Sequence, residues 1–117
     1  MVLQFAPRPG VRCIVDQLLK AGAAPGANLE EARAASTRRE FVRYVEIALR
    51  EANESVYWLR ICTALDLGPK ADIERLRCEG EQIGRILATI VINTKRRMRA
   101  GCAVSAFSIL NLALLLS

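Results

Sequence analysis

Residues 37–59 read TRREFVRYVEIALREANESVYWL, and this stretch decides the fold. Thr37 and Glu40 have the spacing of a capping box, in which a hydroxyl and a carboxylate satisfy free backbone N–H groups at a helix start. Gly68 and Pro69 predict the end of the helix. Between these signals, apolar residues recur at the spacing of an amphipathic helix face. They are Phe41, Val45, Ala48, Leu49, Ala52, Val56 and Leu59.

The segments on either side also have helical periodicity. Residues 11–21 place apolar side chains on one face: Val11, Ile14, Val15, Leu18 and Leu19. Pro25, within Gly22–Gly26, lacks a backbone N–H, so the first segment is either one kinked helix or two short ones. A third helix is expected from about Lys70–Asp72 to about Arg97. Its heptad-like seam consists of Ile73, Leu76, Gly80, Ile83, Leu87 and Ile90.

These elements predict an all-α fold of three main helices suited to bundle packing, with the first segment kinked at Gly22–Gly26. We expect an irregular segment over residues 1–10, the bundle over 11–99 and an apolar tail over 100–117. Gly80 and Gly84 mark places where a partner helix can approach closely.

The charge is unevenly distributed. Twelve basic and twelve acidic residues lie in the first 82 positions and cancel, so the net charge of +5 comes from five later residues. These are Arg85, Lys95, Arg96, Arg97 and Arg99. The cluster at 95–99 is either a solvated helix end or a surface for the phosphates of RNA or DNA. On the second reading, the interface consists of Arg38, Arg39, Arg43, Lys95, Arg96, Arg97 and Arg99.

The tail, residues 100–117, carries no charge. A basic cluster before an uncharged segment resembles a membrane anchor, but eighteen residues span only about 27 Å as a helix and the hydrocarbon core is about 30 Å thick. Packing of the tail against the bundle, or a loosely ordered tail, is the favoured reading.

No catalytic centre is apparent. The chain has no histidine, which removes Cys–His catalysis and the Glu-x-x-His motifs of di-metal bundles. A carboxylate-only site is an alternative, because Glu51 and Glu54 share a helix face, but the favoured reading is solvated carboxylates, with Glu46 and Arg50 forming an i,i+4 ion pair. The four cysteines lack zinc-ligand spacing and suggest free thiols, most of them buried, in a reducing cytoplasm. The prediction is a non-enzyme without metal or cofactor.

Three stretches, in consistent order, resemble the bacterial four-helix bundle family related to the proteins encoded in 23S rRNA intervening sequences. They are Gln17–Leu19 with Gly26–Asn28 and Glu31–Ala32, then Phe41 and Ile47–Glu54 closing on Tyr57–Leu59, and finally Glu81–Leu87.

The resemblance implies an up-down bundle without established enzymatic activity. It also implies a homo-oligomer, often a pentamer, and a suggested association with ribosomes or rRNA. More distant cousins, the accessory proteins of diversity-generating retroelements, bind nucleic acid and a reverse transcriptase. The family's first long helix has no counterpart in residues 1–10, which predicts three of four helices and a core face that needs another cover.

Two further sets of residues are candidates for specific roles. By the resemblance, Asn28, Glu31 and Glu54 correspond to polar positions near a helix junction, where they would satisfy backbone groups freed by the proline. Tyr57 and Trp58 point about 100° apart on a helix, so they cannot both face one core. One of them is a candidate interface anchor, and core packing is favoured for Trp58.

Overall fold

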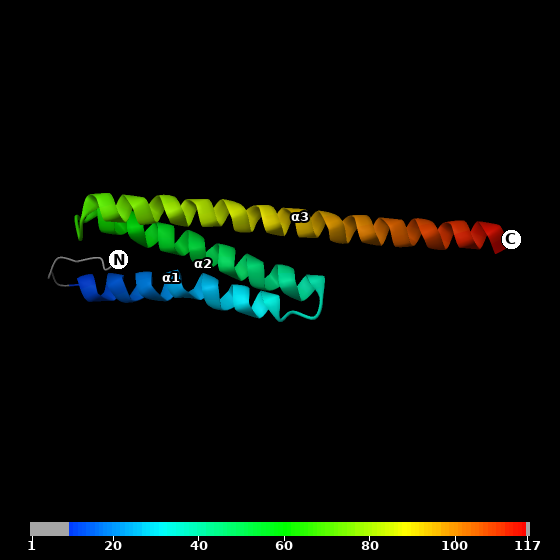
Figure 1. Ribbon diagram of the computed structural model, residues 1–117, viewed down its shortest axis with the longest axis horizontal. Coiled ribbons are helices and arrows are strands. Elements are labelled where there is room, and N and C mark those ends of the chain that lie inside the picture. The colour runs from blue at the N-terminus through cyan, green and yellow to red at the C-terminus, as the bar shows by residue number, and fades with distance from the viewer. Residues whose placement is uncertain (1–9, 117) are drawn as a thin grey trace.

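The computed structural model describes residues 10–116, and within its last helix the side chains of 102–109, 111–113 and 116 lie outside the description. Three helices make up this part of the chain: α1 (Val11–Arg33), α2 (Arg38–Ala64) and α3 (Lys70–Leu116). Figure 1 shows α2 lying between α1 and α3, each neighbour running antiparallel to it. The all-helical, up-down bundle predicted from the sequence is confirmed.

The start of α2 differs in one detail from the predicted capping box. Thr37 Oγ1 accepts a hydrogen bond from the Glu40 backbone N–H at 3.1 Å, as expected. The Glu40 carboxylate, however, accepts from the Ser36 backbone N–H at 3.3 Å and the Ser36 hydroxyl at 3.1 Å. The reciprocal half of the box is thus displaced by one residue, and Glu40 orders the α1–α2 turn.

The end of α2 is a Schellman motif, which precedes the predicted Gly68–Pro69 signal. Asp66 adopts a left-handed conformation with φ 54°, a position that usually holds glycine. Its N–H donates to the Thr63 carbonyl, and the Leu67 N–H donates to the Cys62 carbonyl at 3.0 Å. Leu67 is 2% exposed and packs beside Cys62, so an apolar contact seals the turn. Pro69 then supplies a carbonyl that accepts from the Ile73 N–H at the start of α3.

The core has two clusters, one at each end of α2. Near the α1–α2 turn, side chains of all three helices pack together: Ala32, Val42, Val45, Ala48, Ala52, Leu87 and Val91. Near the α2–α3 turn, the second cluster contains Val11, Leu59, Cys62, Leu67 and Ile73. Burial of these apolar groups is the main driving force that holds the three amphipathic helices together.

Several sequence expectations about the helices need correction. Of the two alternatives for the first segment, the structure has one helix that continues through Pro25. Leu19, predicted on the core face of that helix, is 66% exposed. On α3, Ile83 is 46% exposed, whereas Gly84 and Val91 are buried. The seam therefore runs through Gly84 and Val91, because a helical repeat of 3.6 residues drifts away from the strict 3,4 steps that placed Ile83 in it.

α3 does not end near Arg97 as predicted but continues to Leu116. No proline interrupts it, and Gly101 costs only about 1 kcal/mol relative to alanine. Figure 1 shows the second half of α3 projecting past the α1–α2 turn, and the molecule measures 78 × 21 × 21 Å. The expectation that the tail packs back onto the bundle is wrong. Leu110, Leu114 and Leu115 on the projecting helix are exposed.

Candidate nucleic-acid interface

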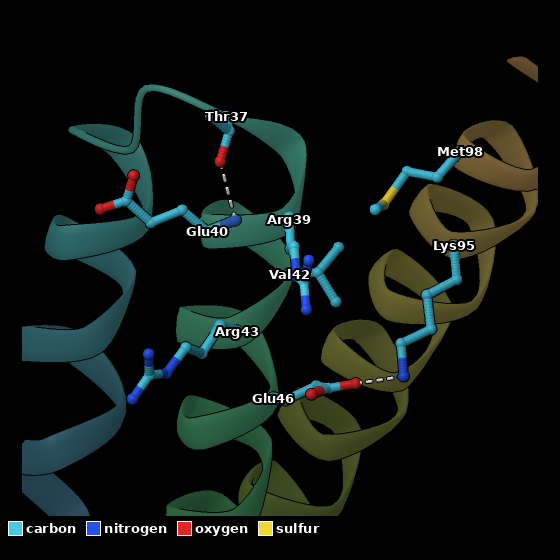
Figure 2. A pocket seen from close by; sticks show the side chains of 8 residues that line it. All are labelled: Thr37, Arg39, Glu40, Val42, Arg43, Glu46, Lys95 and Met98. Atoms are coloured by element: carbon cyan, nitrogen blue, oxygen red, sulfur yellow. Dashed lines mark hydrogen bonds and ion pairs between the residues drawn. The ribbon is translucent and has the colours of Figure 1, made fainter. Parts of the chain in front are cut away.

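The antiparallel packing of α2 and α3 brings the two predicted basic clusters together. The N-terminal turns of α2 carry Arg39 and Arg43, and they lie opposite the stretch of α3 that holds Lys95 and Met98 (Figure 2). An open pocket of about 500 Å³ lies between them. Its lining consists of Thr37, Arg39, Glu40, Val42, Arg43, Glu46, Lys95 and Met98. Residues more than fifty positions apart in the sequence thus form one surface.

Lys95 is held in this pocket by an ion pair across the two helices. Its Nζ contacts Glu46 Oε1, as the dashed line in Figure 2 shows. The predicted i,i+4 pair between Glu46 and Arg50 is therefore wrong, because the carboxylate turns toward α3. Both side chains of the observed pair remain accessible, Lys95 at 48% and Glu46 at 39%. Ion pairs with that exposure contribute about 0–1 kcal/mol.

The other pocket residues differ in orientation. Figure 2 shows Met98 and Lys95 of α3 facing Val42 and Glu46 of α2 across the gap, whereas the Glu40 carboxylate points toward α1. The Arg43 guanidinium also extends toward the α1 side. Val42 is buried and Met98 is partly buried. Together they give the pocket an apolar floor beneath charged walls.

A second hollow of about 410 Å³ lies between the same two helices. Its lining comes from Leu49 and Asn53 of α2 and from Glu81, Gly84, Arg85 and Ala88 of α3. Glu46, Leu49 and Asn53 follow each other at steps of three and four residues, so they share one face of α2. Both hollows lie between α2 and α3, and together they are called the α2–α3 groove below. Gly84 makes room in it, since a Cβ there would stand 3.2 Å from Asn53 Oδ1.

One arginine of the groove lining was absent from the predicted interface, and a second lies near it on α2. Arg85 lines the second hollow. Arg50 is exposed and lies four residues after Glu46, on the same face of α2. The signal that could have found Arg85 is its neighbour Gly84, which marks the close approach of α2, whereas Arg85 and Lys95 lie about 80° apart around the helix. The predicted interface grouped residues 95–99 because they are adjacent in the sequence, without regard to their positions around the helix.

The remaining predicted basic residues are all exposed and lie outside the lining of the groove: Arg38, Arg96, Arg97 and Arg99. Arg99 follows Lys95 by four residues and so lies on the same face of α3. Arg97 follows Lys95 by two residues, about 200° around the helix, and lies on a different face. The structure therefore divides the sequence cluster, with Lys95 and Arg99 on the groove side.

The three residues predicted at the polar junction are dispersed. Asn28 Nδ2 donates to the Ala24 carbonyl at 2.9 Å, next to the proline. Glu31 is exposed near the end of α1. Glu54 accepts from Trp58 Nε1 at 3.2 Å on α2. Among the described hydrogen bonds, those of Asn28 and Glu54 stay within the residue's own helix, and none joins these three residues to one another.

Tyr57 and Trp58 contact each other at the surface of α2. Their ring centroids lie 5.3 Å apart at an interplanar angle of 68°, an edge-to-face arrangement. Tyr57 is 56% exposed, and Trp58 is partly buried with its indole N–H on Glu54. Neither ring lines the α2–α3 groove.

A charged network lies beside the second hollow and shares Glu81 with it. Arg60 of α2 contacts Glu81 of α3 at 3.2 Å, and Arg77 contacts both Glu81 and Glu74. The hydrogen bond from Arg77 lowers the pKa of Glu74, and the same contact raises the pKa of Arg77. These carboxylates are engaged with arginine, and the described residues contain no group of three metal-ligating side chains.

The thiols also differ from expectation. Of the three cysteines whose side chains the structure describes, Cys62 is buried, whereas Cys13 and Cys78 are exposed. Burial raises the pKa of the Cys62 thiol. Cys102 lies outside the described side chains. The prediction that most cysteines are buried is wrong for the described ones.

An apolar stripe runs along α3 away from the groove. Ile83 is 46% and Ile86 is 59% exposed, and the partly buried Ile90 continues the stripe at i+7 from Ile83. As for the membrane-anchor reading, no helix within the described residues has an apolar stretch long enough to cross a bilayer. Most tail side chains lie outside that description.

Comparisons with known proteins agree with the fold. Residues 3–89 match the family described as 23S rRNA-intervening sequence protein. A similar solved structure is a protein of unknown function from the S23 ribosomal protein family of Bacteroides thetaiotaomicron, with 32% identity and a TM-score of 0.65. The similarity covers 67% of this chain and 72% of that chain. No curated protein matches.

Proposed function

This chain belongs to the 23S rRNA-intervening sequence protein family, and from that premise we propose that it is a non-catalytic RNA-associated adaptor of the cytoplasm. In this proposal the α2–α3 groove binds the phosphate backbone of RNA. The observation that carries it is the pocket lined by Arg39 and Arg43 of α2 and by Lys95 of α3. Arginine and lysine gathered on one face are the electrostatic footprint of a nucleic-acid-binding protein.

The chemistry of the groove supports binding without sequence preference. Base recognition in RNA uses stacking on aromatic rings and hydrogen bonds to splayed bases. The two hollows of the groove are lined by arginine, lysine, aliphatic and acidic side chains, and no aromatic ring is among them. Phosphate contacts position a protein on nucleic acid and carry no sequence information.

The test is a salt titration of binding to a structured RNA, followed by fluorescence anisotropy. The logarithm of the binding constant should fall linearly with the logarithm of salt concentration. Replacement of Arg39, Arg43 and Lys95 by alanine should flatten the slope by about 2 to 3, one unit per lost phosphate contact. A matched triple variant of α1, with alanine at Arg12, Lys20 and Arg33, removes the same charge from another face.

The control should keep nearly the full slope, even though its net charge is equally reduced. If both variants lose the same amount of salt dependence, overall charge explains the binding, and a groove interface is contradicted. The absence of binding by the unmodified protein at low salt would end the proposal.

Self-association is the second candidate function, and it has its own observation. The stripe formed by Ile83, Ile86 and Ile90 is an apolar surface on a helix whose other faces pack or carry charge. Contiguous exposed apolar surface marks interaction sites. We expect a homo-oligomer that buries this stripe between subunits. Light scattering should show assembly for the unmodified protein and a monomer after Ile83→Glu with Ile86→Glu. A stable monomer without any substitution would contradict it.

A further inference from the structure

Lys95 has an internal partner in the pocket that the proposed function assigns to RNA. We propose that this pocket is a binding site for a single phosphate group, and that Glu46 is a displaceable competitor which holds Lys95 until the phosphate replaces it. The inference rests on the proposed function for its RNA arm. It adds the ligand group, the residues that receive it and the carboxylate that opposes it.

The donors around the pocket suit a phosphate. Lys95 of α3 brings an ammonium group, and Arg39 brings a guanidinium from the first turn of α2. Guanidinium and ammonium groups form the strong, charge-assisted hydrogen bonds that bind phosphate oxygens. The pocket also lies at the N-terminus of α2, whose first backbone N–H groups and helix dipole favour an anion. The favourable charge at the helix terminus is thus increased by cations from two helices that line the same pocket.

The carboxylates divide into one that faces the pocket and one that does not. Glu40 is engaged with Ser36 in the α1–α2 turn, at 3.3 Å from its N–H and 3.1 Å from its hydroxyl. Glu46 faces Lys95 directly, as Figure 2 shows. The local charge that an incoming anion meets is thus positive, and Glu46 supplies the opposing charge nearest to Lys95.

Glu46 can be displaced because its ion pair is accessible to solvent. Lys95 is 48% and Glu46 is 39% exposed, so water already solvates both partners and their separation costs little. A phosphate group offers more acceptor oxygens than a carboxylate, so it can accept from Lys95 and from a second donor of the pocket lining. An incoming cation would instead meet Arg39 and Lys95. The pocket therefore selects an anion, and a phosphate uses its donors most fully.

The experiment measures RNA binding by the full chain and by three variants at one low salt concentration. Glu46→Gln keeps the size of the side chain and removes its charge, and it should tighten binding about threefold to tenfold. Glu54→Gln is the matched control, since it removes the same charge from α2 outside the pocket. It should change binding less than twofold. Lys95→Ala should weaken binding more strongly in the Glu46→Gln background than in the unmodified protein.

That last comparison is a double-mutant cycle, and it isolates competition from a general change of charge. If Glu46 competes for Lys95, the two substitutions must be coupled. Additive effects of Glu46→Gln and Lys95→Ala, or equal effects of Glu46→Gln and Glu54→Gln, would overturn the inference while RNA binding itself stands.

A second arm uses inorganic pyrophosphate alone, with binding followed by the NMR signals of the Arg39 and Lys95 side chains. Pyrophosphate should shift both signals, and the shifts should be larger in Glu46→Gln. In Lys95→Ala the shift of the Arg39 signal should be lost. These results would support the phosphate site without RNA. Saturation by pyrophosphate at micromolar concentration would identify a free phosphate compound as the source. Saturation only at millimolar concentration, together with tight RNA binding, would identify the RNA backbone. If neither signal moves at millimolar pyrophosphate, the site is refuted whatever the RNA titration shows.

Discussion

Gly80 of α3 lies so close to Val56 of α2 that a Cβ on the glycine would stand 2.9 Å from Val56 Cγ2. Valine has a stiff χ1 angle, so this methyl group cannot move aside cheaply. The contact lies midway along the α2–α3 interface, between the two core clusters. It explains a glycine in a helix interior, where it costs about 1 kcal/mol relative to alanine.

The first prediction follows from this contact. Gly80→Ala should lower the free energy of unfolding by about 1–3 kcal/mol, because overpacking outweighs the gain in helix propensity. Gly26→Ala is the matched control, since a Cβ there meets nothing within 4 Å. It should raise stability by up to about 1 kcal/mol. Urea denaturation monitored by circular dichroism measures both. A stabilising Gly80→Ala would contradict the close packing of α2 on α3.

Thr37 supplies the second prediction, on the helix start that borders the basic pocket. Its hydroxyl accepts from the Glu40 N–H, so Thr37→Ala should destabilise the fold by about 1 kcal/mol and Thr37→Ser should not. Thr89 is exposed in α3 and its hydroxyl only donates to the Arg85 carbonyl. Thr89→Ala should therefore be neutral or slightly stabilising. Equal losses for the two alanine variants would argue against the cap.

The third prediction concerns the buried thiol. Burial both shields Cys62 and raises its pKa, so little thiolate forms and reaction with a maleimide is slow. Peptide mapping by mass spectrometry at pH 8 should show Cys62 modified at least about tenfold more slowly than Cys13 and Cys78. In denaturing urea the difference should vanish. Fast modification of Cys62 in the folded protein would contradict its place in the core.

The fourth prediction is a pH dependence. The carboxyl pKa of Glu74 lies below its ordinary value of 4.5 because Arg77 donates a hydrogen bond to it. A lowered pKa in the folded state means that the contribution to stability is present above the ordinary value and disappears as the pH falls through the folded value. An NMR titration should find the midpoint of Glu74 below 4.5, and Arg77→Gln should return it toward 4.5. An unchanged midpoint in Arg77→Gln would refute the assigned cause.

The sequence predicted that the three helices form, but it did not predict correctly which face of α3 packs against α2. Capping by Thr37, the apolar face of α2 and the close approaches at Gly80 and Gly84 could all be predicted, since each depends on local spacing. Ile83 was placed in the core because its spacing from Gly80 and Leu87 fits an apolar seam, although it is 46% exposed and its neighbour Gly84 is buried. Which side of α3 meets α2 is decided by packing across the interface.

The same distinction applies to the candidate interface. Arg39, Arg43 and Lys95 were predicted as members of two basic clusters, and the antiparallel packing that unites them follows from the bundle. The partner of Glu46 was predicted wrongly. On an isolated helix Arg50 is its nearest cation, but the position of Lys95 opposite Glu46 depends on the axial register of α3 against α2. That register is a property of the whole interface.

The central proposal is that the α2–α3 groove binds RNA. An NMR titration with a short structured RNA tests this proposal most directly. The largest amide shifts should fall on residues 37–53 of α2 and 81–99 of α3, around Arg39, Arg85 and Lys95. Shifts confined to α1 or to the stripe of Ile83, Ile86 and Ile90, or no shifts at low salt, would contradict a groove interface.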